Sequence, residues 1–155
     1  MPTPSEQQMG GLAVGSPVPA IGAEAWVNGP PPADYDGKVI VVHGWFLNCP
    51  YCWEEAPGLG DLARSYAGSD VEFVGLSPDE VSRASAVQEF VEKGGLPYPV
   101  GFGARDALLG FEAEYFPAVW VVDRTGKVVW NKAYEPYVSL EEAIEQALAG
   151  DEPSA

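Results

Sequence analysis

The sequence predicts an α/β domain whose central mixed sheet is flanked by helices. Two observations predict it: continuous β-branched runs, typical of strands buried on both faces, and amphipathic helical segments that alternate with them in the first half of the chain. That alternation predicts parallel strands joined by right-handed crossovers, whereas a turn between two later strands predicts an antiparallel hairpin. A chain of 155 residues, 46% of them apolar, is long enough for one domain with a hydrophobic core.

The first half of the chain supplies the predicted strands and helices in alternation. Residues 23–27 alternate weakly and predict a short strand, whereas residues 39–42 (Val-Ile-Val-Val) and 71–76 predict buried strands. Apolar residues at three- and four-residue spacing predict a helix over residues 50–66, kinked at the proline inside it. Residues 77–80 (Ser-Pro-Asp-Glu) have the form of a capping box, which predicts that a second helix begins there and ends at a pair of glycines.

The second half predicts the strands that complete the sheet. Residues 96–117 mix an extended stretch with a short helical candidate around residues 105–109. Residues 118–122 predict a third strong strand, and a turn of Asp-Arg-Thr-Gly leads to its hairpin partner over residues 127–130. Ser-Leu-Glu-Glu at residues 139–142 is a second capping box, which predicts the start of a last helix.

Composition sets the domain boundaries and excludes several partners. Residues 1–15 are rich in small and polar residues without periodicity, so we expect a flexible leader there, a domain over residues 16–150 and a tail over residues 151–155. The 23 acidic and 8 basic residues give a net charge of −15, which repels phosphate backbones and anionic lipid, so we expect no nucleic-acid partner. No apolar run reaches the ~18 residues of a membrane span, so we expect no membrane insertion by this segment. We also expect a monomer.

The two cysteines indicate redox chemistry. Cys49 and Cys52 would close almost no loop, so a stabilising disulfide is a weak explanation for the pair. Cys49 follows a buried strand and Pro50 opens a helix, so the thiol of Cys49 lies where unpaired backbone N–H groups stabilise a thiolate. Cys52, one turn later, can resolve a mixed disulfide formed on Cys49. A zinc site needs two further ligands, and with one histidine and no other cysteine we expect no metal and no cofactor beyond the disulfide itself.

Glu55 is the next candidate residue. Counting 100° per residue from Cys52 places Glu55 on the apolar face of the predicted helix, where its carboxylate could carry the proton of the resolving thiol. The alternative is a carboxylate that turns outward or pairs with a lysine such as Lys127 or Lys132. His43, on the strand before the dithiol, is expected to be a structural histidine, because a lone histidine on a buried strand usually is one.

Aromatic residues near the dithiol predict an apolar rim that binds protein substrates. The rim would consist of Trp45, Tyr51, Trp53 and Phe116, together with Pro50 and Pro117. Trp45 can equally be read as a core residue.

With Trp45, Cys49-Pro50-Tyr51-Cys52, Glu55, Pro57, Pro117 and the turn over residues 123–127 in hand, the chain resembles thioredoxins. More narrowly, over about residues 16–149 it resembles the thioredoxin-like proteins of the bacterial cell envelope related to TlpA and ResA. This resemblance implies a thioredoxin fold with an N-terminal strand or hairpin extension and a helical insertion near residues 78–95.

The resemblance also implies roles for individual residues. Cys49 matches the nucleophile, Cys52 the resolving thiol, Glu55 the acid three residues after it, and Pro117 the cis-proline. The implied activity is thiol–disulfide exchange, as a reductant, with protein thiols and disulfides and with an upstream electron donor or acceptor. The implied location is extracytoplasmic, in the periplasm or cell envelope, with the cytoplasm as the alternative.

The chain departs from this family at three points. Its Pro50-Tyr51 pair is that of glutaredoxins, yet the segment after Pro117 lacks their diglycine glutathione site, so we infer no glutathione binding. Asn48 replaces the tryptophan usual before the first cysteine. Phe116 replaces the small or β-branched residue usual before the cis-proline, which bears on the size of the substrate groove.

Three other functions compete with this interpretation. A thiol peroxidase carries Thr or Ser three residues before its reactive cysteine and Pro seven before it, whereas here Phe46 and Val42 occupy those positions. A copper(I) chaperone would use the soft thiolates of the dithiol, but its relatives of this fold carry a histidine after the cysteines that this chain lacks. The third is a non-catalytic module that has kept the fold, against which the intact dithiol argues.

Overall fold

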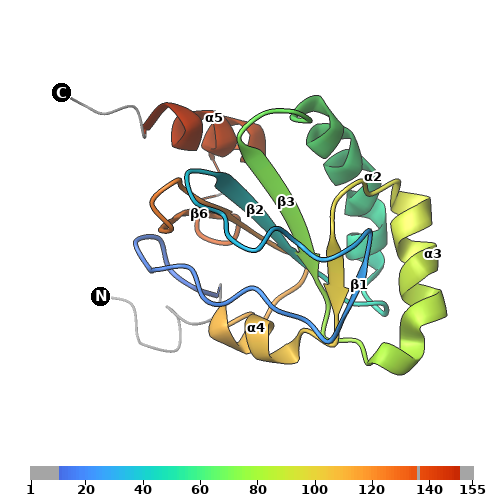
Figure 1. The fold of residues 1–155 in the computed structure, drawn as a ribbon. Coiled ribbons are helices and arrows are strands. Elements are labelled where there is room, and N and C mark those ends of the chain that lie inside the picture. The colour runs from blue at the N-terminus through green and yellow to red at the C-terminus, as the bar shows by residue number, and fades with distance from the viewer. Residues whose placement is uncertain (1–10, 136, 151–155) are drawn as a thin grey trace.

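The computed structural model describes residues 11–135 and 137–150, and six strands of this part form one mixed sheet in the order β1-β4-β3-β2-β5-β6 (Figure 1). The neighbouring pairs β2–β3 and β3–β4 are parallel, and the other pairs are antiparallel, so the predicted mixed sheet is confirmed. The strands are β1 (Ala25–Val27), β2 (Val39–Gly44), β3 (Val71–Leu76), β4 (Val100–Phe102), β5 (Ala118–Val122) and β6 (Val128–Asn131).

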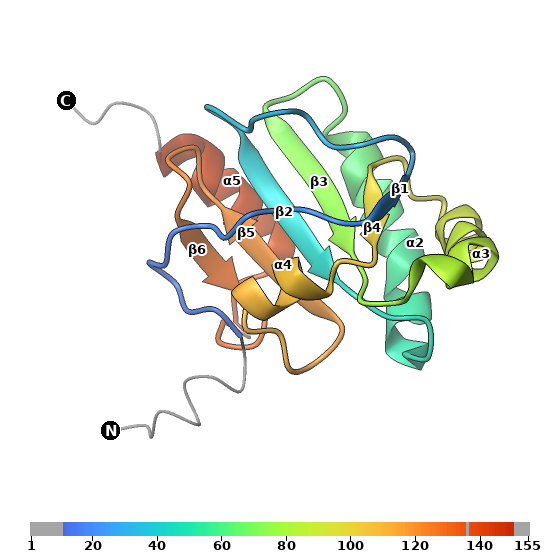
Figure 2. The same cartoon turned by 60° about the horizontal axis from the view of Figure 1, so that its bottom comes forward.

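Helices cover both faces of this sheet (Figure 2). On one face lie α2, α3 and α5, and on the other lies the short α4. Their bounds are α2 (Pro50–Ser65), α3 (Ala84–Gly94), α4 (Arg105–Gly110) and α5 (Leu140–Gly150), and a 3-10 turn, η1 (Val81–Arg83), precedes α3. None of the helices in the described ranges combines the length and the apolar character that a membrane crossing requires.

Strand β2 lies at the centre of the fold because it is apolar on both faces. All six of its residues are buried, as its continuous β-branched run predicts. Val39 and Val41 face the core under α2, α3 and α5, whereas Ile40 and Val42 face the core under α4. The strand therefore has packing on both sides up to the loop that leads to the dithiol.

The two capping boxes have different outcomes. At the last helix the prediction is confirmed, because the Ser139 hydroxyl accepts the Glu142 backbone N–H at 3.1 Å. At Ser77 it is wrong: the Ser77 hydroxyl accepts the Asp79 N–H at 3.0 Å, and the helical turn begins only at Val81. A serine bonded to the residue two positions later closes a local turn, which competes with a helix start.

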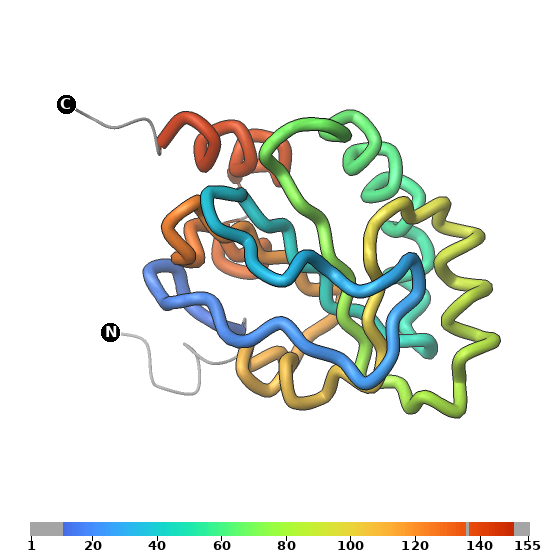
Figure 3. Tube along the Cα trace, in the orientation of Figure 1, coloured from blue at the N-terminus to red at the C-terminus, as the bar shows by residue number. Residues whose placement is uncertain are grey.

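Residues 11–24, which precede β1, are more ordered than their composition indicates. Within the predicted leader, Leu12 donates its N–H to Phe111 and Gly15 to Val128, and Val18 follows with a bond to Gly126. Figure 3 follows this segment across the sheet to β1, and its apolar side chains pack against the core under α4. Residues 1–10 of the predicted leader and the predicted tail over residues 151–155 lie outside the described residues.

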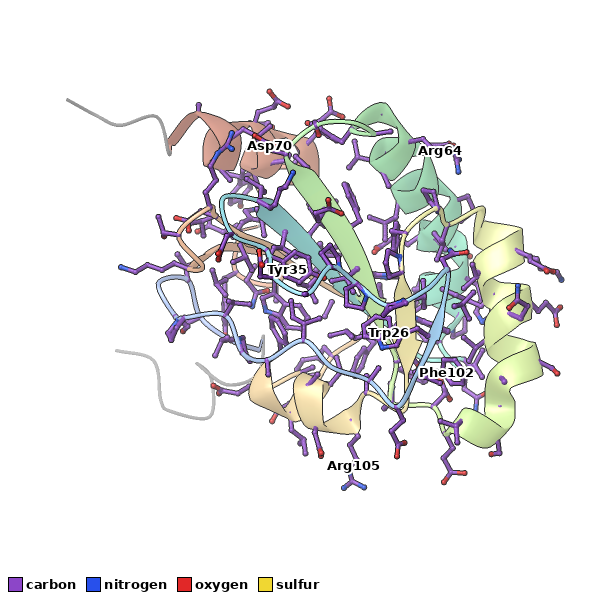
Figure 4. The ribbon with its side chains drawn as sticks, viewed as in Figure 1. Trp26, Tyr35, Arg64, Asp70, Phe102 and Arg105 are labelled. Atoms are coloured by element: carbon purple, nitrogen blue, oxygen red, sulfur yellow. A yellow bond between two sulfur atoms is a disulfide. The ribbon has the colours of Figure 1, made fainter. Side chains whose placement is uncertain are left out.

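One end of the sheet carries the dithiol. Parallel strands β2 and β3 both end there, and the loop from β2 enters α2 at Pro50. Figure 4 shows Arg105 at this end of the molecule, in the lower part of the view, whereas Arg64 and Asp70 lie at the opposite end. The carboxyl ends of adjacent parallel strands are where ligand sites of open α/β sheets gather.

Candidate active site

The dithiol occupies the first turn of α2. Cys49 is the N-cap residue and its Sγ accepts the Cys52 backbone N–H at 3.2 Å, while Pro50 opens the helix. Cys49 and Cys52 are joined in a disulfide, with their Cα atoms 5.3 Å apart. Cys49 is 4% exposed and Cys52 is fully buried, so Cys49 is the sulfur nearer to solvent. The Cys52 N–H, in the first turn of the helix, already donates to the Cys49 sulfur and would also stabilise that sulfur as a thiolate.

Hydrogen bonds to Leu47 hold the loop that presents Cys49. The Leu47 N–H donates to Asp79 Oδ2 at 2.8 Å, and the Leu47 carbonyl accepts Trp53 Nε1–H at the same distance. Asp79 Oδ2 also accepts the Ser77 hydroxyl at 2.6 Å. The turn after β3 therefore anchors the loop after β2. Sequence reasoning missed Asp79, although its position just after a strand parallel to β2 is a signal that could have found it.

Part of the predicted aromatic rim surrounds this loop. Tyr51 is 70% exposed, and the half-buried Phe116 packs edge to face on Phe46, with ring centroids 5.3 Å apart. The Phe116–Pro117 peptide bond is cis, as the resemblance implies. It lies beside the loop because Ala118, the next residue, pairs with the last residue of β2.

Trp45 does not belong to this rim, which corrects the prediction that it binds substrate. Its side chain is fully buried and stacks on Phe90 with ring centroids 3.7 Å apart. Phe90 also contacts Trp53, whose ring is half-buried and bonded to the loop. Trp45 is a core residue because it continues the alternation of β2 onto the face covered by α2 and α3.

Glu55 faces inward, as the helical count predicts, and it also pairs with Lys132, one of the two lysines of the alternative interpretation. Its role as a proton carrier stays a prediction. Its side chain is 23% exposed, and its Oε2 lies 2.5 Å from Lys132 Nζ. Its Oε1 lies 3.5 Å from Nε2 of His43, a side chain that is 2% exposed. Burial, and secondarily the charge of Lys132, lowers the pKa of His43 to about 3, so its imidazole is neutral at pH 7.

A cavity of about 550 Å³ opens beside Glu55 and Lys132. It lies between α2, the hairpin of β5 and β6, and the start of α5, and most of its wall is apolar. The residues that line it are Glu55, Gly58, Leu59, Leu62, Val119, Trp130, Lys132, Glu135, Val138, Ser139 and Leu140. Across residues 11–135 and 137–150, no three His, Cys, Asp or Glu side chains gather in a way that could hold a metal ion.

A mixed sheet with a dithiol at the N-terminus of the helix after its central strand, and with a cis-proline just before the strand that pairs with that central strand, defines a thioredoxin-fold domain with a redox-active centre. The chain belongs to the AhpC/TSA family, whose model matches residues 14–131.

Individual relatives agree with this assignment. The thiol-disulfide oxidoreductase ResA of Bacillus thuringiensis (strain Al Hakam) is 31% identical over 97 residues, which cover 62% of this chain and 55% of ResA. The chain thus matches about half the length of that relative. Protein FixW of Rhizobium leguminosarum is 27% identical over 153 residues, which cover 90% of this chain and 68% of FixW.

Solved structures confirm the predicted thioredoxin fold. A thioredoxin-like protein in its oxidised form superimposes with a TM-score of 0.72 at 23% identity, over 88% of this chain and 97% of that one. A thioredoxin-family thiol:disulfide interchange protein from Chlorobium tepidum gives a TM-score of 0.68 at 23% identity, over 88% and 98% of the two chains.

Proposed function

We propose that this domain is a thiol–disulfide oxidoreductase that reduces disulfides of protein substrates through Cys49 and Cys52. The observation that carries the proposal is the position of the pair: the outer sulfur caps the helix and accepts an amide N–H, and the inner sulfur lies buried within bonding distance of it. The similarity to ResA supports the same reaction class.

The reaction proceeds in two thiol–disulfide exchanges, and in each of them one S–S bond forms as another breaks. In the reduced domain the Cys49 thiolate attacks one sulfur of the substrate disulfide; an S–S bond to Cys49 forms and one substrate thiolate leaves. Cys52 then loses its proton and attacks Cys49, which forms the internal disulfide and releases the second substrate thiolate. The substrate gains two electrons and the domain loses two, and an upstream dithiol donor returns them.

Glu55 is the proposed acceptor of the Cys52 proton. It lies one turn after Cys52 on the inward face of α2 and borders the cavity, through which the proton can leave to solvent. Tyr51, Phe116, Pro50 and Pro117 are the proposed contacts for the substrate chain. Pro50 and the exposed Tyr51 directly follow Cys49, and Phe116, next to Pro117, packs on Phe46 of the loop that leads to Cys49.

The setting of the reaction follows from the family resemblance. We propose an extracytoplasmic location, in the periplasm or cell envelope, and a monomeric domain that meets its protein partners transiently. The charge of −15 favours partners that present basic surface near their disulfide.

The test is disulfide exchange by matched cysteine variants. Wild-type domain should accelerate the reduction of insulin disulfides by dithiothreitol, Cys49→Ser should lose this activity, and Cys52→Ser should trap a mixed disulfide on Cys49. No acceleration by the wild type would overturn the proposal. Rapid consumption of hydrogen peroxide by the reduced domain would favour the thiol peroxidase instead.

A further inference from the structure

His43 is a buried titratable residue that the mechanism above does not use. It lies on β2 at the same parity as Val39 and Val41, so its side chain faces the core under α2. In the sheet it lies between Gly75 of β3 and Val119 of β5. Its imidazole is therefore enclosed between the central strand and the helix that carries the dithiol.

Buried polar atoms of His43 and Glu55 lie close to each other without forming a hydrogen bond. Glu55 Oε1 and both imidazole nitrogens are buried, and among the described residues none of the three has a hydrogen-bond partner that meets strict geometry. His43 Nε2 and Glu55 Oε1 lie 3.5 Å apart. Buried polar atoms are nearly always paired, and a small side-chain adjustment closes this distance to a hydrogen bond.

We propose that His43 is a positioning residue for Glu55: as a neutral imidazole with its proton on Nε2, it donates to Oε1 and holds the carboxylate to receive the proton of Cys52. Lys132 binds the other oxygen, so each carboxylate oxygen has its own donor. During the exchange the Cys52 proton passes to Glu55 and then to solvent, while His43 keeps its own. The inference rests on the proposed function of the dithiol.

The groups around His43 fix its charge state. Lys132 places its positive charge at the Glu55 carboxylate. A protonated, positively charged His43 would be repelled by that charge, and its burial would also disfavour the charge. From the loop before β4, the buried Tyr98 hydroxyl has its pKa raised by burial and by the charge of Glu55, so it stays neutral and adds no charge. From α2, the Glu55 carboxylate itself faces the imidazole.

The first test separates the two sulfur exchanges with Ellman's reagent. Attack by Cys49 releases one equivalent of thionitrobenzoate, and attack by Cys52 on the resulting mixed disulfide releases the second. Cys52→Ser stops after the first equivalent and so calibrates the signal. We expect His43→Leu to slow the second release at pH 7 about tenfold or more, because a hydrogen bond to a charged group is lost. The first release should change less than about threefold, because it does not involve Glu55.

His43→Gln is the matched variant, since its amide can donate from nearly the same place. It should restore the second release to within about threefold of wild type, whereas a merely structural role predicts equal losses for Leu and Gln. Equal rates in both variants, or a second release that His43→Leu leaves unchanged, would overturn the proposal. If wild type itself fails at the first release, the proposed function fails instead.

NMR of the wild type tests the tautomer without a mutation. The chain has one histidine, so its imidazole nitrogens give an unambiguous pair of ¹⁵N signals. We expect a protonated Nε2 and a bare Nδ1 at pH 7. An imidazolium or an Nδ1–H tautomer would overturn the proposal.

Discussion

Replacing Asp79 tests how the fold holds the loop that presents Cys49. Asp79 Oδ2 accepts two hydrogen bonds, from the Leu47 N–H at 2.8 Å and the Ser77 hydroxyl at 2.6 Å. Hydrogen bonds to a charged group contribute about 1.5–3 kcal/mol each when buried, and the half-buried position of Asp79 places these two at the lower end. Asp79→Ala leaves both donors unpaired, and Ser77 is fully buried, so we expect a loss of about 2–3 kcal/mol in the free energy of unfolding.

Asp79→Asn is the control, because its amide oxygen can accept both donors without the charge. We expect it to lose about 1 kcal/mol. For a domain of this size, about 1 kcal/mol corresponds to roughly 2–4 °C in Tm, so Asp79→Ala should melt about 5–10 °C below wild type. Thermal and urea unfolding of the oxidised proteins give both numbers. Equal losses in the two variants, or Asp79→Ala within about 0.5 kcal/mol of wild type, would refute the hydrogen-bond argument.

Three further predictions use other parts of the molecule. A Cβ at Gly60 of α2 would lie 2.8 Å from two backbone carbonyl oxygens at the end of α3, whereas one at Gly58 meets nothing within 4 Å. Urea unfolding should therefore show Gly60→Ala destabilised by about 1–3 kcal/mol and Gly58→Ala stabilised by about 0.5–1 kcal/mol. Burial lowers the pKa of His43 from 6.5 to about 3, so the unfolded chain binds a proton in this window that the folded chain does not. The stability of wild type relative to His43→Gln should fall by about 1 kcal/mol per pH unit from pH 6.5 toward pH 4, and parallel curves would contradict this. Reduction of the buried disulfide should raise tryptophan emission at Trp53, and Cys52→Ser should show no such change.

The elements that the sequence predicted well are those whose pattern is decided locally or by the central core. Strand β3 and strand β5 have the predicted bounds, because their apolar runs are buried on both faces. The short helix α4 begins at Arg105 as predicted. The cysteines could be located because a strand end and a following proline define a helix N-terminus within a few residues.

The elements that the sequence did not predict depend on partners far along the chain. Strand β4 has only three residues and is held by pairing with β1 and β3, which no local pattern encodes. The capping-box pattern of residues 77–80 predicted the wrong helix start because Ser77 bonds to Asp79 in a local turn. The Asp79 carboxylate also accepts the N–H of Leu47, 32 residues earlier. The contacts of Glu55 join α2 to β2 and to Lys132 after β6, and only the folded chain brings these three segments together.

The most direct test of the account is the redox equilibrium of the Cys49–Cys52 pair. Thiol trapping across a series of redox buffers should show one two-electron couple within the chain, with a potential near the thioredoxin value of about −270 mV. A reversible couple near about −120 mV would contradict the reductant role and mark an oxidant. If no reversible disulfide forms between Cys49 and Cys52, the proposed function itself is wrong.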